Sequence, residues 1–325
     1  MQIGNLNVHF IGDPHLGRKF ETGVPLHRRG EREASVQEQF KRELLVACDV
    51  NICVGDIFDK FVVAPEVVLF VVEAYREAMR ERPNTAFVIL RGNHDASRDT
   101  DKASSFDLLY ELLDGLGMIT VVKDTIFVYD SQPVGAKIAF LPWMPFETAA
   151  QMASKLTGQF DCVVGHWDMS DYGGDAHNVI PLPQLQGKTK LVVSGHDHNG
   201  KDYDVDGMKI HYTGSMQPYS HGEDAAGALY VSLTLDQLRA DPGAYRDKNV
   251  RVLLKPGESL DFEIDCLALT QKRVAADLQE EEGIEIQLDT FDMQAILRRA
   301  LERNSVSDTT AQRTMDMYME RRNAE

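Results

Sequence analysis

The sequence predicts an α/β protein in which short buried strands alternate with amphipathic helices. Apolar, β-rich runs recur along the first two-thirds of the chain, and each ends in glycine or a polar cluster. Helix-like segments separate the early runs, whereas later runs follow one another closely, which favours a mixed sheet or two sheets with helices outside. The expected strands are 7–11, 50–54, 86–90, 137–140, 161–164, 190–194, 209–212 and 228–233.

Three helices are expected between the early strands. Ser35 is a candidate N-cap of a helix that runs to about Cys48, because Glu38 three residues later completes a capping box. A second helix continues from Pro65 to Glu81, with proline at a favourable first-turn position. The third helix covers 103–116.

The character of the sequence changes after Leu235, and the turn-forming run Asp241-Pro242-Gly243 follows. We therefore expect a main domain over 1–240, a small domain over 241–288 and a helical segment over 289–325. Apolar positions of the last segment lie on the faces of two amphipathic helices, broken near Asn304.

The chain has 325 residues and a formal net charge of −17. Phosphate binding depends on lysine and arginine, so this charge taken alone argues against a nucleic-acid partner. However, a metal site built from carboxylates adds acidic residues to the sum, and residues 18–32 are rich in arginine, with a lysine and a histidine among them. The net charge is therefore weak evidence against DNA.

Other features of the composition bear on the cellular location. No apolar run approaches the roughly 20 residues that span a bilayer. The first residues lack a basic start followed by a long apolar stretch, so they do not resemble a signal peptide. The four cysteines are scattered, as is typical of free thiols in a reducing cytosol. We expect a cytoplasmic protein that does not enter a membrane.

Five polar clusters come directly after strand-like runs, where loops on a rigid scaffold carry function. They are Gly12-Asp13-Pro14-His15, Gly55-Asp56-Ile57-Phe58-Asp59, Gly92-Asn93-His94-Asp95, Gly165-His166 and Gly195-His196-Asp197-His198. One such cluster has an ordinary structural explanation, because Asp and His are common near turns. A set of five in this order, each following a buried strand, indicates a functional site.

The side chains in these clusters suit divalent metal ions. Asp13 and His15 are two residues apart, so on an extended stretch they point to the same side and grip one ion. Asn93 adds an amide oxygen, and the histidines of the last two clusters add ring nitrogens. This oxygen and nitrogen set without thiolate suits Mn, Fe, Zn or Mg and disfavours a structural zinc site. A carboxylate shared by two cations holds them roughly 3.5–4 Å apart.

The pattern G-D-x-H, G-D-x-x-D, G-N-H-D, G-H and G-H-x-H resembles the calcineurin-like metallophosphoesterases over about residues 7–233. Within that group the chain is similar to the SbcD-type nuclease subunit of the double-strand-break repair complex. The features that carry this likeness are Leu141-Pro142-Trp143, the segment from Tyr212 to Glu223 and the C-terminal helices. The short length and compact tail are typical of phage-encoded members. The resemblance implies a four-layer sandwich of two sheets between helices.

The resemblance also assigns roles to individual residues. It implies a first metal position held by Asp13, His15, Asp56 and His198, and a second held by Asp56, Asn93, His166 and His196, so that Asp56 bridges. His94 acts on the substrate, and Asp95 orients it. The candidate DNA contacts are Arg18, Arg28 and Arg29, with a solvated basic loop as the alternative. Two departures from the family pattern are Met216-Gln217 and His221.

The implied activity is metal-dependent cleavage of DNA, as a 3′-to-5′ exonuclease and endonuclease. It uses two divalent ions, with manganese preferred and magnesium as the alternative. The resemblance further implies that the small domain caps the site and binds DNA and that the chain forms a homodimer. We expect the helical segment to bind an SbcC-type coiled-coil ABC ATPase, with packing on its own domain as the alternative. Two rival functions stay open: a protein phosphatase or nucleotide phosphodiesterase of the same fold, and a non-catalytic scaffold.

Overall fold

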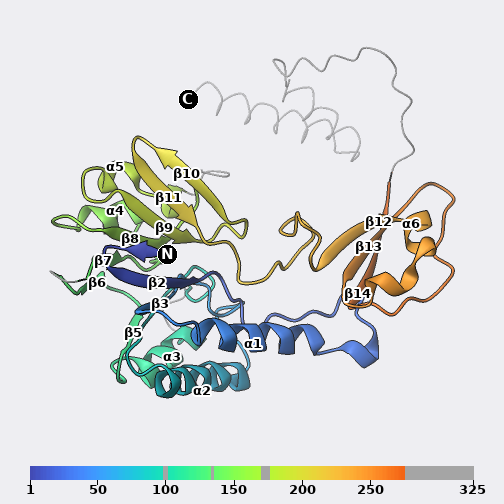
Figure 1. Cartoon of the computed structure of the whole chain (residues 1–325), viewed down its shortest axis with the longest axis horizontal. Helices are drawn as coiled ribbons and strands as arrows, with labels where there is room; N and C mark the ends of the chain where they lie inside the picture. The colour runs from blue at the N-terminus through green and yellow to red at the C-terminus, as the bar shows by residue number, and fades with distance from the viewer. Residues whose placement is uncertain (98–101, 133–134, 170–175, 275–325) are drawn as a thin grey trace, which may run out of the picture. The chain divides into compact units, whose positions relative to one another are not determined.

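The computed structural model describes residues 1–97, 102–132, 135–169 and 176–274 (Figure 1). The chain divides into two units, Met1–Val274 and Ala275–Glu325, and all the described residues belong to the first. The expected helical segment over 289–325 and the last part of the expected small domain lie outside them. The division into three domains therefore stays a prediction.

The first sheet is built mainly from parallel strands joined by helical crossovers. Its order is β1-β2-β3-β4-β5, in which β1 is antiparallel to β2 and the other neighbours are parallel. The strands span Gln2–Ile3, Leu6–Ile11, Val50–Cys53, Ala86–Leu90 and Ile119–Val122. The helices α1 (Glu31–Leu44), α2 (Pro65–Glu81) and α3 (Ser105–Leu113) connect them, with a short 3-10 helix η1 at Leu26–Arg28.

The second sheet has the order β10-β11-β9-β8-β7-β6, with antiparallel pairs only at its two edges. Its strands, from β6 to β11, span Phe127–Asp130, Lys137–Phe140, Cys162–His166, Leu191–Gly195, Lys201–Val205 and Met208–Tyr212. The associated helices are α4 (Ala149–Ser154), the 3-10 helix η2 (Ala176–Asn178) and α5 (Leu182–Leu185).

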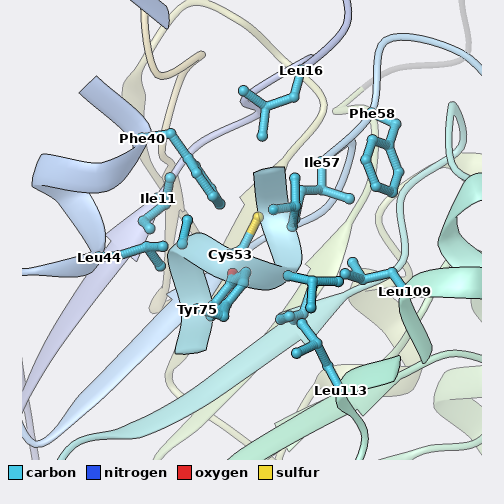
Figure 2. Close-up of a cluster of buried hydrophobic side chains, with 14 of the residues drawn as sticks. Ile11, Leu16, Phe40, Leu44, Cys53, Ile57, Phe58, Tyr75, Leu109 and Leu113 are labelled. Atoms are coloured by element: carbon cyan, nitrogen blue, oxygen red, sulfur yellow. The ribbon is translucent and has the colours of Figure 1, made fainter. Parts of the chain in front are cut away.

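Three apolar cores define four layers. One core fills the space between the sheets, where Ile52 and Val88 of the first meet Phe140 and Val164 of the second. A second core packs α1, α2 and α3 on the outer face of the first sheet, and Figure 2 shows Phe40, Tyr75 and Leu109 among its buried side chains. The third core places α4 and α5 on the outer face of the second sheet. The expected sandwich of two sheets between helices is confirmed.

A third, smaller sheet follows in the sequence. Strands β12 (Tyr230–Thr234), β13 (Asn249–Leu254) and β14 (Ala268–Arg273) are parallel and lie in that order. Helix α6 (Leu235–Ala240) contributes Leu235 and Leu238 to the core on one face, and the 3-10 helix η3 (Pro242–Tyr245) follows it. This sheet includes residues on both sides of the boundary expected at residue 240.

Every strand expected from the sequence has a counterpart, but the start of the first helix was wrong. Helix α1 begins at Glu31, after Gly30 with φ 91°, and Ser35 lies inside it. Tertiary contacts favour the earlier start over the cap expected at Ser35. Arg32, in the first turn of α1, is buried and donates a hydrogen bond to Gln217. Pro65 does begin α2. The capping box of α3 is formed by Ser104 and Asp107.

No helix in the described part of the chain is both long and apolar enough to cross a membrane.

Candidate metal centre

The five polar clusters meet at the carboxyl ends of β2, β3 and β4 in the first sheet and of β8 and β9 in the second. Parallel strands place these ends at one edge of each sheet. In the described residues, positive φ angles outside glycine occur at His15, Asp56, His196 and Asp206. Such backbone conformations are strained and concentrate at functional sites, and all but Asp206 are predicted ligands.

Glycines let these loops approach one another closely. A Cβ atom at Gly195 would lie 2.5 Å from Oδ1 of Asp13, and one at Gly55, where φ is 120°, would collide with the His166 ring. Any side chain at these two positions would therefore push predicted ligands apart.

The first predicted metal position brings together Asp13, His15 and His198 from two sheets. Nε2 of His15 lies 3.0 Å from Nε2 of His198, and Nε2 of His198 lies 3.8 Å from Oδ2 of Asp13. The buried Asp56 is next to them, with Oδ2 at 3.8 Å from Nε2 of His15. These atoms are close enough to share one ion.

The second predicted position joins Asp56 with His166 and His196. Oδ1 of Asn93 lies 2.9 Å from Nε2 of His166 and 3.0 Å from Nδ1 of His196. Oδ2 of Asp56 lies 3.3 Å from Nε2 of His166. The same Asp56 oxygen therefore faces both groups, as the bridging role implied by the resemblance requires.

The charges of this centre fit a bound cation. Oδ1 of Asp13 and Nδ1 of His15 are buried without a hydrogen-bond partner among the described residues. Burial lowers the pKa of His166, but the negative charges of Asp56 and Asp13 outweigh it and raise that pKa to about 10. Burial also raises the pKa of Asp13 to about 6. A buried group of oxygen and nitrogen donors that draws positive charge suits a divalent metal.

His94 is more exposed than the predicted ligands and borders the centre. Its backbone N–H donates to Oδ1 of Asp56 at 2.8 Å, and its ring lies edge-on to His15 with centroids 4.8 Å apart. Nδ1 lies 2.7 Å from the carbonyl oxygen of Asp59, so this nitrogen donates and Nε2 is free of the proton in the neutral ring.

The expectation that Asp95 orients His94 was wrong. The fully buried Asp95 carboxylate accepts hydrogen bonds from the backbone N–H groups of Ile57, Phe58 and Gly92. The carbonyl of Asp59 holds the His94 ring instead. Asp95 thus ties together two of the loops that carry predicted ligands.

The candidate DNA contacts separate into different environments. Arg18 lies beside the centre, with its guanidinium over the Tyr219 ring and 3.5 Å from Asp59. Arg28 is buried and donates to Glu31, to Asp265 and to the carbonyl of Arg246, so it cannot reach a phosphate. That assignment was wrong, because Arg28 ties the start of α1 to the segments that precede β13 and β14. Arg29 is exposed.

A hollow of about 700 Å³ opens beside His94. It is lined by Arg18, Lys19, Asp59, Lys60, Phe61, Asn93, His94 and Ala96. Lys60 was not singled out from the sequence, although it directly follows the second cluster.

Two carboxylates next to the predicted ligands were also missed. Oδ2 of Asp168 lies 3.2 Å from His196, and Oε2 of Glu223 lies 3.4 Å from His198. Asp168 follows His166 by two residues, and this spacing is a usable sequence signal on an extended stretch. Glu223 is the last residue of the segment from Tyr212 to Glu223 that carries part of the family resemblance, but no spacing in the sequence connects it with His198.

Comparison with known proteins identifies the family. Residues 6–200 match the calcineurin-like phosphoesterases, so the match covers more than half of the chain. The chain therefore belongs to this family, whose members use divalent metals to hydrolyse phosphoesters. No curated protein matches the chain.

Solved structures also resemble the chain, at low identity. Phosphopantetheinyl hydrolase from Mycobacterium tuberculosis is 12% identical with a TM-score of 0.38, over 66% of this chain and 93% of that one. A structure described as a novel archaeal phosphodiesterase is 15% identical with a TM-score of 0.33, over 66% and 88%. GAP50 of Plasmodium, described as the anchor in the inner membrane complex, is 16% identical with a TM-score of 0.40, over 65% and 72%.

Proposed function

We propose that this chain is the nuclease subunit of an SbcCD-type complex, a metal-dependent 3′-to-5′ exonuclease and endonuclease that acts in DNA repair, recombination and replication. The predicted ligands supply the chemistry common to the whole family. The observation that carries the choice of DNA is a basic, hydroxyl-rich path that runs from His94 to the third sheet.

The path begins at the hollow beside His94, where Arg18, Lys19 and Lys60 lie around the site. A second hollow of about 260 Å³ shares Arg18 and Lys19 with the first and continues to Arg251 and Thr270 of the third sheet. Basic and hydroxyl side chains are the groups that hold nucleic-acid phosphates.

The third sheet extends this path by the alternation of its strands. Val250, Val252 and Leu254 point into the apolar core, so Arg251 and Leu253 face the other side. Arg251 pairs in register with Ser232 and Thr270, and Leu253 pairs with Lys272. A small phosphoester would fill only the first hollow, whereas a polyanion would engage both hollows and this face.

The chain's own residues divide the work of hydrolysis. When bound, divalent cations polarise the scissile phosphate and lower the pKa of a water molecule. The predicted ligands fix the geometry, and Arg18 and Lys60 orient the phosphate. His94, held through Nδ1 by the Asp59 carbonyl, presents Nε2 to the substrate. Protonated at Nε2, it stabilises phosphate oxygens or gives the proton to the leaving oxygen.

The partners follow from the resemblance. We propose manganese as the preferred ion, an SbcC-type ATPase bound through 289–325, and a phage-encoded chain that acts in the host cytoplasm. We also propose a homodimer. Leu108 and Leu112 lie one turn apart on α3 and are exposed, which gives a second copy an apolar surface to cover.

One preparation tests the choice of substrate. The metal-free chain is supplied with Mn²⁺ and assayed on linear duplex DNA labelled at its 3′ end, on a phosphopeptide and on a cyclic nucleotide, with His94→Asn as the matched control. We expect metal-dependent release of nucleotides from DNA that the variant loses. Turnover of only the phosphopeptide or cyclic nucleotide would favour the rival enzymes, and no turnover with no bound metal would favour a scaffold.

A further inference from the structure

Each histidine of the predicted metal centre has one ring nitrogen that faces away from the metal position. The histidines differ in the group that contacts this outer nitrogen. In His198, Nε2 faces His15 and Asp13, which leaves Nδ1 on the outer side. Oε2 of Glu223 lies 3.4 Å from that Nδ1. A carboxylate at this place favours the tautomer with the proton on Nδ1, so the lone pair of Nε2 is directed toward the first metal position.

Glu223 is itself held in place. Its Oε2 accepts from the backbone N–H of Tyr219 at 2.8 Å, and its Oε1 accepts from the hydroxyl of Ser220 at 2.9 Å. The hydroxyl of Ser215 is 3.5 Å from Oε2. The Tyr219 ring lies edge-on to both His15 and His198. The carboxylate is therefore fixed before any ligand binds.

His196 has the equivalent arrangement at the second position with its ring nitrogens exchanged. Nδ1 lies 3.0 Å from Oδ1 of Asn93, and Nε2 lies 3.2 Å from Oδ2 of Asp168. The backbone of Asp168 is anchored on both sides, because its N–H donates to the carbonyl of Asn178 and its carbonyl accepts from Ile180.

The remaining two histidines are held differently. Nδ1 of His166 lies 3.0 Å from the carbonyl oxygen of Val54, so a backbone group fixes its tautomer. Nδ1 of His15 has no hydrogen-bond partner among the residues described, and Asp59 approaches it only to 3.9 Å. Each predicted metal position thus has one histidine with a close carboxylate behind it.

We propose that Glu223 and Asp168 are positioning residues for the metal centre, one for each ion. Glu223 acts through His198 on the first position, and Asp168 acts through His196 on the second. Each carboxylate fixes the tautomer and the orientation of its histidine and makes the ligating nitrogen more basic. This inference rests on the metal centre of the proposed function and is independent of the substrate.

The test is a titration of the metal-free full-length chain with Mn²⁺ alone. Binding is monitored by calorimetry and by the electron paramagnetic resonance signal of free Mn²⁺. Glu223→Ala and Asp168→Ala should each weaken one of two binding events by about 10–100-fold. Glu223→Gln and Asp168→Asn retain an oxygen that accepts the ring proton, so they should recover most of the affinity.

Asp197→Ala is the matched control. This carboxylate lies between the two histidines in the sequence but contacts Lys201 and the backbone N–H of Asn199. Its loss should leave Mn²⁺ affinity unchanged. Circular dichroism checks that each variant is folded. If one alanine variant does not fold, the amide variant at that position and the alanine variant at the other carboxylate still test the proposal.

Unchanged Mn²⁺ affinity in both folded alanine variants would overturn the proposal. A loss in the amide variants as large as in the alanine variants would do the same. A wild-type chain without Mn²⁺ affinity would refute the metal centre and this inference together. Two bound ions with the expected losses but no DNA cleavage would leave the inference standing and remove the proposed nuclease.

Discussion

The floor and the rim of the site differ in how the chain builds them. The floor consists of Asp13, His15, Asp56 and His166, each at most 2% exposed and each at, or within a few residues of, the carboxyl end of a strand. The rim consists of Arg18, Lys19, Lys60 and Arg251, which come from separate loops and from the third sheet. In the proposed function the floor, built at the strand ends, would carry the reaction, whereas the rim, assembled from distant segments, would select the substrate.

The largest effect is expected in the floor. Asp56→Ala removes the oxygen that faces both predicted metal positions, so Mn²⁺ binding and phosphodiester hydrolysis should both fall to background. Elemental analysis and a DNA cleavage assay measure the two effects on one sample. A folded variant that keeps the metal content of the wild type would contradict the bridging role.

At the border between floor and rim, His94→Asn should lower kcat by about 10²–10⁴-fold, because a positioned acid is lost. Mn²⁺ affinity should stay unchanged, since His94 is not a predicted ligand. Single-turnover kinetics on 3′-labelled DNA and a Mn²⁺ titration measure the two quantities. Normal turnover by a metal-loaded His94→Asn chain would show that the ring plays no part in the reaction.

A smaller effect is expected in the rim. Arg18→Ala and Arg251→Ala should weaken DNA binding uniformly across sequences, and each should reduce the slope of log affinity against log salt concentration by about 1. Fluorescence anisotropy over a range of salt concentrations measures this slope. Hydrolysis of a small chromogenic phosphodiester should stay near the wild-type rate for Arg251→Ala, because Arg251 lies outside the first hollow.

Arg28→Ala should have the smallest effect on DNA. Its guanidinium is buried against Glu31, Asp265 and a backbone carbonyl, so its loss should lower the free energy of unfolding by about 1–3 kcal/mol. DNA affinity and its salt slope should not change. Denaturant unfolding and the same anisotropy assay test both statements, and a salt slope reduced as in Arg18→Ala would show that Arg28 contacts DNA after all.

The same contrast explains what the sequence could predict. The predicted ligands follow buried strands, and parallel strands bring their carboxyl ends together, so a local pattern was enough to predict that these side chains meet. Asp95 shows the limit of that reasoning. The resemblance implied that Asp95 orients the neighbouring His94, but its carboxylate accepts hydrogen bonds from three backbone N–H groups instead.

Contacts between segments that are far apart in the sequence determine the features that the sequence did not predict. Ser35 and Glu38 match a local capping pattern, yet α1 starts earlier because Arg32 packs against Gln217. Glu223 reaches His198, and Arg251 reaches the hollow beside Arg18, only after the third sheet and the loop before it have folded. No spacing along the chain encodes these approaches.

A crystal structure of the chain with Mn²⁺, with the ions located by anomalous diffraction, tests the central claim most directly. We predict two ions roughly 3.5–4 Å apart with a carboxylate oxygen of Asp56 between them. Asp13, His15 and His198 should bind one ion, and Asn93, His166 and His196 the other. An ion found away from Asp56, or a single ion that uses only one of the two groups, would contradict the account.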